Sequence, residues 1–195
     1  MKGYFSIDIE TTGLDPNKHK VLEIACLYIK VGETPNLEKL NREGRVFHVY
    51  LNVSVSDIVN GDKVAIEMNK KTIEDILNKS LKSYITRSDF VMPKLEQWAR
   101  KFIDKETERM VVAGKNFGVF DYQFLKNLPN WNNSLMSRRF LDPSMFYINF
   151  KEDDFSPSLE TCLERAGMDS HVNHTAVDDA LQVAQLINAA YKSHR

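Results

Sequence analysis

Apolar and polar residues alternate along the stretch GYFSIDIE, residues 3–10, close to the start of the chain. Side chains of a β-strand point to alternate faces, so this period of two predicts a strand. Its apolar face consists of Phe5, Ile7 and Ile9. The opposite face carries Asp8 and Glu10, next to a Thr-Thr-Gly turn. Because the apolar face must pack inward, we expect a central strand whose carboxylates are partly covered.

The rest of the chain alternates between strand-like and helix-like patterns. Runs rich in β-branched and aromatic residues predict strands at 21–30, 44–52 and 109–116, and a short one within 138–146. Apolar residues at helical spacing predict helices at 69–85, from 88, from 121, at 156–167 and at 176–191. The polar segment 32–41 is predicted to be a hairpin loop. Three strands followed by alternating helices and strands indicate an α/β fold with a mixed sheet.

The composition of the 195 residues is that of an ordinary water-soluble protein, with a net charge of −1. We expect one domain, residues 1–195, because the chain is long enough for one substantial core. No apolar run reaches the roughly 18 residues of a membrane helix, and no signal peptide is expected. Cys26 and Cys162 are expected to be buried free thiols, which favours a reducing, cytoplasmic location. Nucleic acid would be contacted through a local patch, not the whole surface.

Asp8 and Glu10 would lie about 7 Å apart along the first strand. Two carboxylates this close in a half-buried site repel one another and lose hydration unless a cation pairs with them. An edge strand with a solvated acidic face is the alternative, and the pair by itself is compatible with both. The Thr-Thr-Gly-Leu turn at 11–14 adds weight to a binding site, because a glycine turn lets backbone amides approach a ligand closely.

A third carboxylate follows the predicted buried strand 109–116. Asp121 stands near the carboxyl end of that strand, where open α/β sheets bind their ligands. It could also serve only to stabilise the N-terminus of the next helix. Its place in the sequence therefore fits either a site residue or a helix-entry residue.

The last predicted helix carries a carboxylate within its apolar stripe. At about 100° per residue, the stripe consists of Ala176, Ala180, Val183, Leu186, Ile187 and Ala190. Asp179 lies inside this stripe, whereas Asp178 lies on the polar face, where a first-turn charge favours the helix dipole. A carboxylate that faces the core needs a partner, so we expect Asp179 to be the functional residue of the two. His174 precedes it by five residues.

These carboxylates and the histidine come from three separate elements that can face one crevice. Hard oxygen ligands suit Mg²⁺ or Mn²⁺, and no cluster of Cys and His has the spacing of a zinc site. Two such ions about 3.5–4 Å apart can stabilise the attacking and leaving oxygens of an in-line displacement at phosphorus. The sequence therefore predicts a two-ion centre for phosphodiester chemistry.

The order and spacing of these residues resemble the DEDDh 3′–5′ exonucleases of the RNase H-like fold. That family includes the proofreading subunit of bacterial replicative polymerase, RNase T and oligoribonuclease. Its three motifs are matched by residues 8–14 (DIETTGL), 116–121 (NFGVFD) and 174–179 (HTAVDD). The related DEDDy branch has Tyr four residues before the last Asp, where this chain has Thr175. The stretch IEMNKKTIEDI, residues 66–76, also resembles small exonucleases encoded by bacteriophages.

The resemblance implies an α/β, RNase H-like fold with a central mixed five-stranded sheet flanked by helices. It implies that the catalytic residues are Asp8, Glu10, Asp121, His174 and Asp179. The four carboxylates would bind two divalent ions, Mg²⁺ or Mn²⁺, and His174 would be the general base. The residues expected to seat the terminal nucleotide are Thr11, Thr12, Gly13, Leu14, Asn116 and Phe120. Lys115, Arg138 and Arg139 are either contacts for the nucleic-acid backbone or solvated surface residues.

The predicted function is metal-dependent hydrolysis of the terminal phosphodiester at the 3′ end of single-stranded DNA or RNA, releasing nucleoside 5′-monophosphates. One alternative is an oligoribonuclease-like enzyme that trims RNA, because recognition of the 2′-hydroxyl depends on the shape of the pocket. The other is a non-catalytic nucleic-acid-binding module or polymerase accessory subunit, against which the presence of all five family residues argues. No membrane partner is expected, and a homodimer or a polymerase partner would each fit the family.

Overall fold

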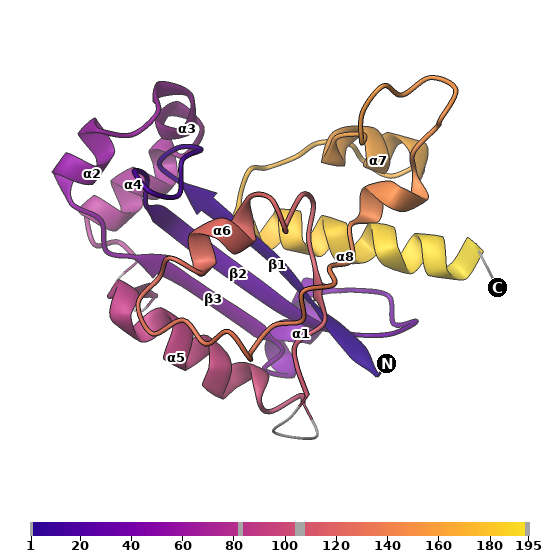
Figure 1. Ribbon diagram of the computed structural model, residues 1–195, viewed down its shortest axis with the longest axis horizontal. Helices are drawn as coiled ribbons and strands as arrows, with labels where there is room; N and C mark the ends of the chain where they lie inside the picture. The colour runs from indigo at the N-terminus through magenta and orange to yellow at the C-terminus, as the bar shows by residue number, and fades with distance from the viewer. Residues whose placement is uncertain (1, 82–83, 104–107, 194–195) are drawn as a thin grey trace.

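The computed structural model describes residues 2–81, 84–103 and 108–193, and shows a five-stranded sheet flanked by helices (Figure 1). The strands are β1 (Gly3–Thr11), β2 (Val21–Lys30), β3 (Val46–Leu51), β4 (Ile85–Thr86) and β5 (Val112–Ala113). Their order in the sheet is β4-β3-β2-β1-β5. Strands β1, β2 and β3 pair antiparallel, whereas β5 is parallel to β1 and β4 is parallel to β3. The mixed α/β class is confirmed, and β1 is an inner strand as predicted.

Helices cover both faces of this sheet. The helices of the described residues are α1 (Leu37–Arg42), α2 (Val55–Val59), α3 (Lys63–Met68), α4 (Lys70–Leu77), α5 (Ser88–Ala99), α6 (Asp121–Leu125), the 3₁₀ helix η1 (Pro143–Phe146), α7 (Leu159–Arg165) and α8 (Ala176–Ser193). Helices α5 and α8 pack on opposite faces (Figure 1). The hydroxyls of Tyr4 and Ser6 in β1 donate to the carbonyls of Ala184 and Ala180 in α8. The carboxylates of β1 therefore face the same side as α8, because alternate residues of a strand share a face.

The segment between β2 and β3 differs from the prediction. Residues 32–41 were expected to be a hairpin loop, but they contain most of α1. The side chain of Asn36 caps this helix by accepting a hydrogen bond from the backbone N–H of Lys39. A single capping residue therefore starts a helix in a segment whose polar composition indicated a loop.

The predicted helix at 69–85 was too long. Helix α4 ends at Leu77, and Lys79 has a φ of 56°, a left-handed conformation that does not continue a helix. Residues 85–86 form β4 instead, and residues 82–83 of the predicted helix lie outside the described part of the chain. The outermost strand beside β3 is therefore one that the apolar pattern did not reveal.

No ladder of strand pairs forms within residues 138–146, all of which are described. Leu141 makes an isolated bridge to Ala113, and η1 begins two residues later at Pro143. Proline has no backbone N–H to give to a ladder, and the side chain of Asp142 accepts from the N–H of Ser144 to stabilise the turn. The predicted strand 109–116 is likewise reduced to the two residues of β5.

Helices α2 and α3 were not predicted, whereas β1, β2, β3, α5, α7 and α8 follow the predicted pattern closely. Helix α8 spans 18 residues, and the apolar stripe described for it is buried or packed against the core. Cys26 and Cys162 are both free and buried, as expected. Among the described helices, none is both long and apolar enough to span a membrane.

Candidate metal centre

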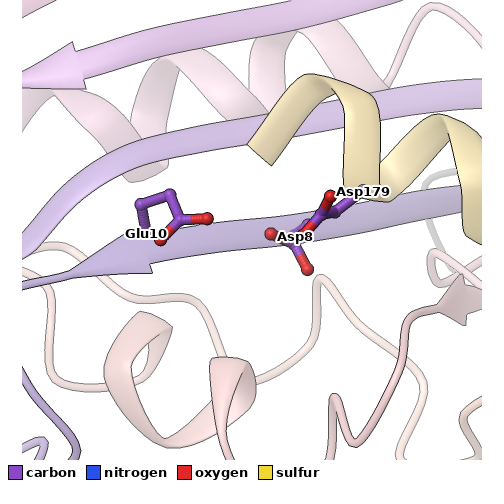
Figure 2. Close-up of side chains that lie close together, drawn as sticks. All are labelled: Asp8, Glu10 and Asp179. Atoms are coloured by element: carbon purple, nitrogen blue, oxygen red, sulfur yellow. The ribbon is translucent and has the colours of Figure 1, made fainter. Parts of the chain in front are cut away.

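Three carboxylates meet where β1 passes the first turn of α8. Asp8, Glu10 and Asp179 each offer an oxygen atom, and these atoms lie within 4.8 Å of one another. Figure 2 shows Asp8 and Asp179 side by side, with Glu10 further along β1. Asp179 is only 8% exposed, and its Oδ1 atom is buried without a hydrogen-bond partner among the described residues. A buried carboxylate oxygen with no donor fits a site whose partner is a cation.

The local structure explains how residues 171 positions apart are brought together. Asp8 and Glu10 share a face because they lie two apart in β1. Asp179 lies in the first turn of α8, and its backbone N–H donates to the carbonyl of Thr175 (3.0 Å). The next residue, Ala180, accepts the hydroxyl of Ser6 at 2.7 Å, which joins this turn directly to β1. The apolar stripe of α8 thus places Asp179 over the acidic end of the strand.

Asp121 reaches the same strand from α6. Its Oδ1 atom accepts a hydrogen bond from the backbone N–H of Ile9 (3.1 Å), and its side chain is 3% exposed. Upstream in β1, the N–H of Phe5 donates to the carbonyl of Val111 in the parallel pairing with β5. Beyond the end of β5, the Asp121 carboxylate therefore accepts a backbone hydrogen bond from β1 in place of a further strand residue. Asp121 lies next to Asp8 but is not part of the cluster of three.

Burial dominates the electrostatics of this centre. It raises the pKa of Asp8 well above its ordinary value, and the neighbouring carboxylates of Asp121 and Asp179 raise it further. Burial raises the pKa of Glu10 to about 8 and that of Asp179 to about 7, and it also raises the pKa of Asp121. A divalent ion would lower these values, because it binds the deprotonated carboxylates and displaces their protons. The hard oxygen donors of the cluster suit Mg²⁺ or Mn²⁺.

Two polar residues beside the cluster were missed from the sequence. The side-chain N–H of Asn69, at the junction of α3 and α4, donates to Oε2 of Glu10 (3.0 Å) and reaches the carbonyl of Thr11 (3.4 Å). Glu23 in β2 pairs across the sheet with Glu10 and is 1% exposed. A carboxylate inside the apolar strand VLEIAC was a visible signal for Glu23, whereas nothing in the local pattern marked Asn69.

Glu23 links β2 to the start of α8 and to β3. Its Oε2 atom accepts from the backbone N–H of Ala176 (3.4 Å), and its Oε1 atom lies 2.7 Å from Nε2 of His48. Ala176 comes two residues after His174, so Glu23 fixes the backbone at the end of the segment that carries this histidine. The structure thus adds a further buried carboxylate whose contacts are made within the protein.

His174 lies outside α8 and is exposed, with a φ of 51°. It lines a cavity of about 380 Å³ together with Asp8 and Asp179. Lys115 lines this cavity too, whereas Arg138 and Arg139 are exposed elsewhere and are not part of its wall. The structure therefore brings His174 and Lys115 to the acidic cluster but not the two arginines.

The turn after β1 is held rigidly. Thr11 and Thr12 are buried, and Thr11 Oγ1 donates to the carbonyl of Gly13 (2.7 Å). A Cβ atom at Gly13 would lie 2.5 Å from the ring of His19, so this position requires glycine. Leu14, at the tip, is 71% exposed. The turn thus presents one apolar side chain on a fixed backbone.

Asn116 and Phe120, the other two residues expected to contact the substrate, differ in their exposure to solvent. Asn116 is exposed, has a φ of 55°, and its N–H donates to Oδ2 of Asp142 (2.9 Å). Phe120 is half-buried, with its ring centroid 5.1 Å from that of Phe124 in the core. Phe120 therefore has a packing role whether or not it also contacts a ligand.

Sites for two divalent ions occur in nucleases, phosphatases, polymerases and aminopeptidases. The chain belongs to the RNase T exonuclease family, since the sequence model of that family, described as Exonuclease, matches residues 5–187. This confirms the family expected from the three sequence motifs. A comparison with curated protein sequences found no match.

Solved structures share this fold at low sequence identity. Exonuclease I of E. coli, in complex with a dA16 oligonucleotide, has a TM-score of 0.62 at 14% identity over 96% of this chain and 41% of that chain. Cell-death related nuclease 4 has a TM-score of 0.64 at 13% identity over 96% of this chain and 63% of that chain. The nuclease domain of 3′hExo, described as a DEDDh family member and bound to rAMP, has a TM-score of 0.62 at 15% identity over 99% of this chain and 92% of that domain.

These neighbours confirm the RNase H-like exonuclease fold with its central mixed sheet. The chain spans about two fifths of the length of E. coli Exonuclease I.

Proposed function

We propose that this protein is a DEDDh-type 3′–5′ exonuclease that hydrolyses the terminal phosphodiester of single-stranded DNA or RNA and releases nucleoside 5′-monophosphates. One observation carries the proposal: in a chain of the exonuclease family, Asp8, Glu10 and Asp179 present oxygen atoms within 4.8 Å of one another. Such a cluster suits two divalent ions, Mg²⁺ or Mn²⁺. Asp8, Glu10 and Asp179 would hold these ions, and Asp121 would support them from the start of α6.

The remaining roles follow from position. Divalent ions held by these carboxylates would make water acidic enough to attack at neutral pH and would neutralise charge that develops on the phosphate. His174, exposed at the edge of the same cavity as Asp8 and Asp179, would accept the proton of the attacking water. The new bond forms between water oxygen and phosphorus, and the bond from phosphorus to the 3′-oxygen of the penultimate nucleotide breaks. Thr11, Thr12, Gly13, Leu14, Asn116 and Phe120 would surround the terminal nucleotide.

Digestion of end-labelled oligonucleotides tests this function. With a 5′ label, single-stranded DNA or RNA is expected to give a ladder of progressively shorter products in Mg²⁺ or Mn²⁺, and with a 3′ label it is expected to give labelled mononucleotide at once. A chelator is expected to stop both reactions. Products that shorten from the 5′ end, or no metal-dependent shortening of either polymer, would contradict the proposal. The DNA and RNA arms, compared by kcat/KM, separate a general exonuclease from an RNA-trimming enzyme.

Asn69→Ala is expected to weaken Mn²⁺ binding by about tenfold, because groups that orient metal ligands contribute about 10–100-fold to affinity or activity. The variant loses the hydrogen bond that holds Oε2 of Glu10. Isothermal titration calorimetry measures the affinity, and thermal unfolding shows whether the variant still folds. Asn78→Ala, at the exposed C-terminal cap of α4, is the matched control and is expected to bind Mn²⁺ like the parent. Equal affinities for the parent and a folded Asn69→Ala protein would refute this role.

A further inference from the structure

A cavity lies beside the acidic cluster, and its lining residues show which side of the cluster it meets. Asp8, Asp179 and His174 form one part of its wall, and Lys115 and His171 line it as well. Glu10 lies at the other end of the cluster, where the buried side chain of Asn69 covers it through its hydrogen bonds. Asp8 and Asp179 line the cavity and Glu10 does not, so the cavity meets the cluster at its Asp8 and Asp179 side.

A second cavity lies next to this one. His171 lines both, and the second cavity has a volume of about 630 Å³ along α8. Its wall includes the amide side chains of Asn173, Gln182 and Gln185. If the terminal nucleotide lies at the turn 11–14, as proposed above, the strand would continue past Asp8 toward this second cavity. The part of the strand that lies there is on the 5′ side of the bond to be cut.

Lys115 is the single Lys or Arg among the described residues that line the cavity next to the cluster. Its backbone is held on both sides, because the N–H of Gly114 donates to the carbonyl of Leu141 (3.1 Å) and the N–H of Asn116 donates to Asp142 (2.9 Å). Its Nζ atom donates to Oδ1 of Asn116 (2.7 Å), a neutral partner, so its charge is available to an anion.

The other charges of the cavity are acidic. Asp8, Asp179 and the exposed Glu160 all line it. The carboxylates of the cluster would be neutralised by divalent ions, whereas Glu160 lies outside the cluster and keeps its negative charge. Lys115 is then the cation of this cavity that can attract a phosphate lying beyond those ions. A local cation is needed there because the chain has a net charge of −1 and offers no general attraction to a polyanion.

We propose that Lys115 binds the backbone phosphate immediately 5′ of the scissile phosphodiester. This inference rests on the proposed exonuclease function and assigns to one residue the recognition of the strand that remains after each cut. The ligand is a phosphodiester, which DNA and RNA share, and Lys115 would contact its non-bridging oxygens. The contact would hold the shortened strand for the next cycle without touching its bases.

Two substrates of different length test this contact. The p-nitrophenyl ester of thymidine 5′-monophosphate has a scissile phosphodiester but no phosphate on the 5′ side, whereas an oligonucleotide has both. Lys115→Ala is expected to lower kcat/KM for the oligonucleotide about tenfold, mainly through KM, and by at least fivefold more than for the ester. The slope of log KM against log salt concentration is expected to decrease by about one, the amount that corresponds to the loss of one phosphate contact. Lys115→Arg is expected to restore most of the loss because it keeps the charge.

Lys101→Ala is the matched control, since Lys101 is exposed just after α5 and does not line the cavity. Equal losses on both substrates, or an unchanged salt dependence, would overturn the assignment to the upstream phosphate. If the parent protein hydrolyses neither substrate, the proposed function fails, and fluorescence anisotropy of a labelled oligonucleotide still decides the contact. Binding by Lys115→Ala equal to that of the parent in that measurement would overturn it.

Discussion

Replacing Asp179 with Asn is expected to lower kcat/KM for an oligonucleotide by about 10³-fold, since each tenfold corresponds to about 1.4 kcal/mol and metal ions contribute several kcal/mol to such reactions. The change removes one carboxylate from the cluster of three but keeps the size of the side chain. The same variant is expected to bind Mn²⁺ more weakly. Both quantities can be measured on a protein shown to be folded by circular dichroism.

Asp178→Asn provides the control, because it makes the same chemical change one residue away. Asp178 turns from the cluster, and its Oδ2 atom accepts from the side chains of Thr175 and Asn173 (both 3.0 Å). Its replacement is expected to affect the start of α8 by about 1 kcal/mol of stability and to leave catalysis within about threefold. Comparable losses of activity in the two variants would contradict both the helical-wheel argument and the site.

The metal-free protein is expected to lose stability as the pH rises from about 5 to about 8. Burial raises the pKa of Glu10 to about 8 and that of Asp179 to about 7, while in the unfolded chain both carboxyls titrate near 4. Between these values the folded state binds more protons than the unfolded state, so the free energy of unfolding falls with pH. Hydrogen bonds with Arg45 lower the pKa of Glu33 to about 2. The stability that this carboxylate contributes is therefore already present at pH 5 and does not change between pH 5 and pH 8.

The expected decrease is about 2 kcal/mol or more, which corresponds to about 4–8 °C in Tm for a chain of this length. Differential scanning calorimetry in a chelator measures it. Mn²⁺ or Mg²⁺ at the upper pH is expected to recover the lost stability, because the ion binds the deprotonated carboxylates of the folded state only. Asp8→Asn is expected to flatten the pH dependence and to raise Tm without metal, because it removes a repelling charge. A Tm that stays constant or rises between these pH values would show that the cluster is not strained.

The loss of activity expected for Asp179→Asn and the pH dependence of stability both arise from the same cluster of carboxylates. The negative charges of three carboxylates, Asp8, Glu10 and Asp179, repel one another in a partly buried site. The fold holds them together because the apolar faces of β1 and α8 are packed in the core. The hydroxyl of Ser6 on Ala180 and the burial of the α8 stripe hold the carboxylates close even without an ion. The centre is thus organised by packing, and the ions would relieve its repulsion.

The periodic elements, and the clustering of the acidic residues on them, could be read from the sequence. The alternation of 3–10 placed Asp8 and Glu10 on one face of a central strand, and the wheel of α8 selected Asp179 over Asp178. These predictions depend on repeats of two or about 3.6 residues, which local backbone geometry imposes. The two short strands β4 and β5 and the helix α1 were misjudged, since neighbours in the fold and a single cap decide them.

The sequence by itself determined the character of the centre, a set of hard oxygen donors with one histidine, because residue type fixes ligand chemistry. Only the tertiary structure decided what surrounds it. Asn69 is 59 positions from Glu10, and Glu23 meets the N-terminus of α8 across 153 positions. Lys115 lines the cavity because it follows the end of β5 by two residues, whereas Arg138 and Arg139 do not line it. Such contacts are set by the packing of distant elements, and no local period in the sequence records them.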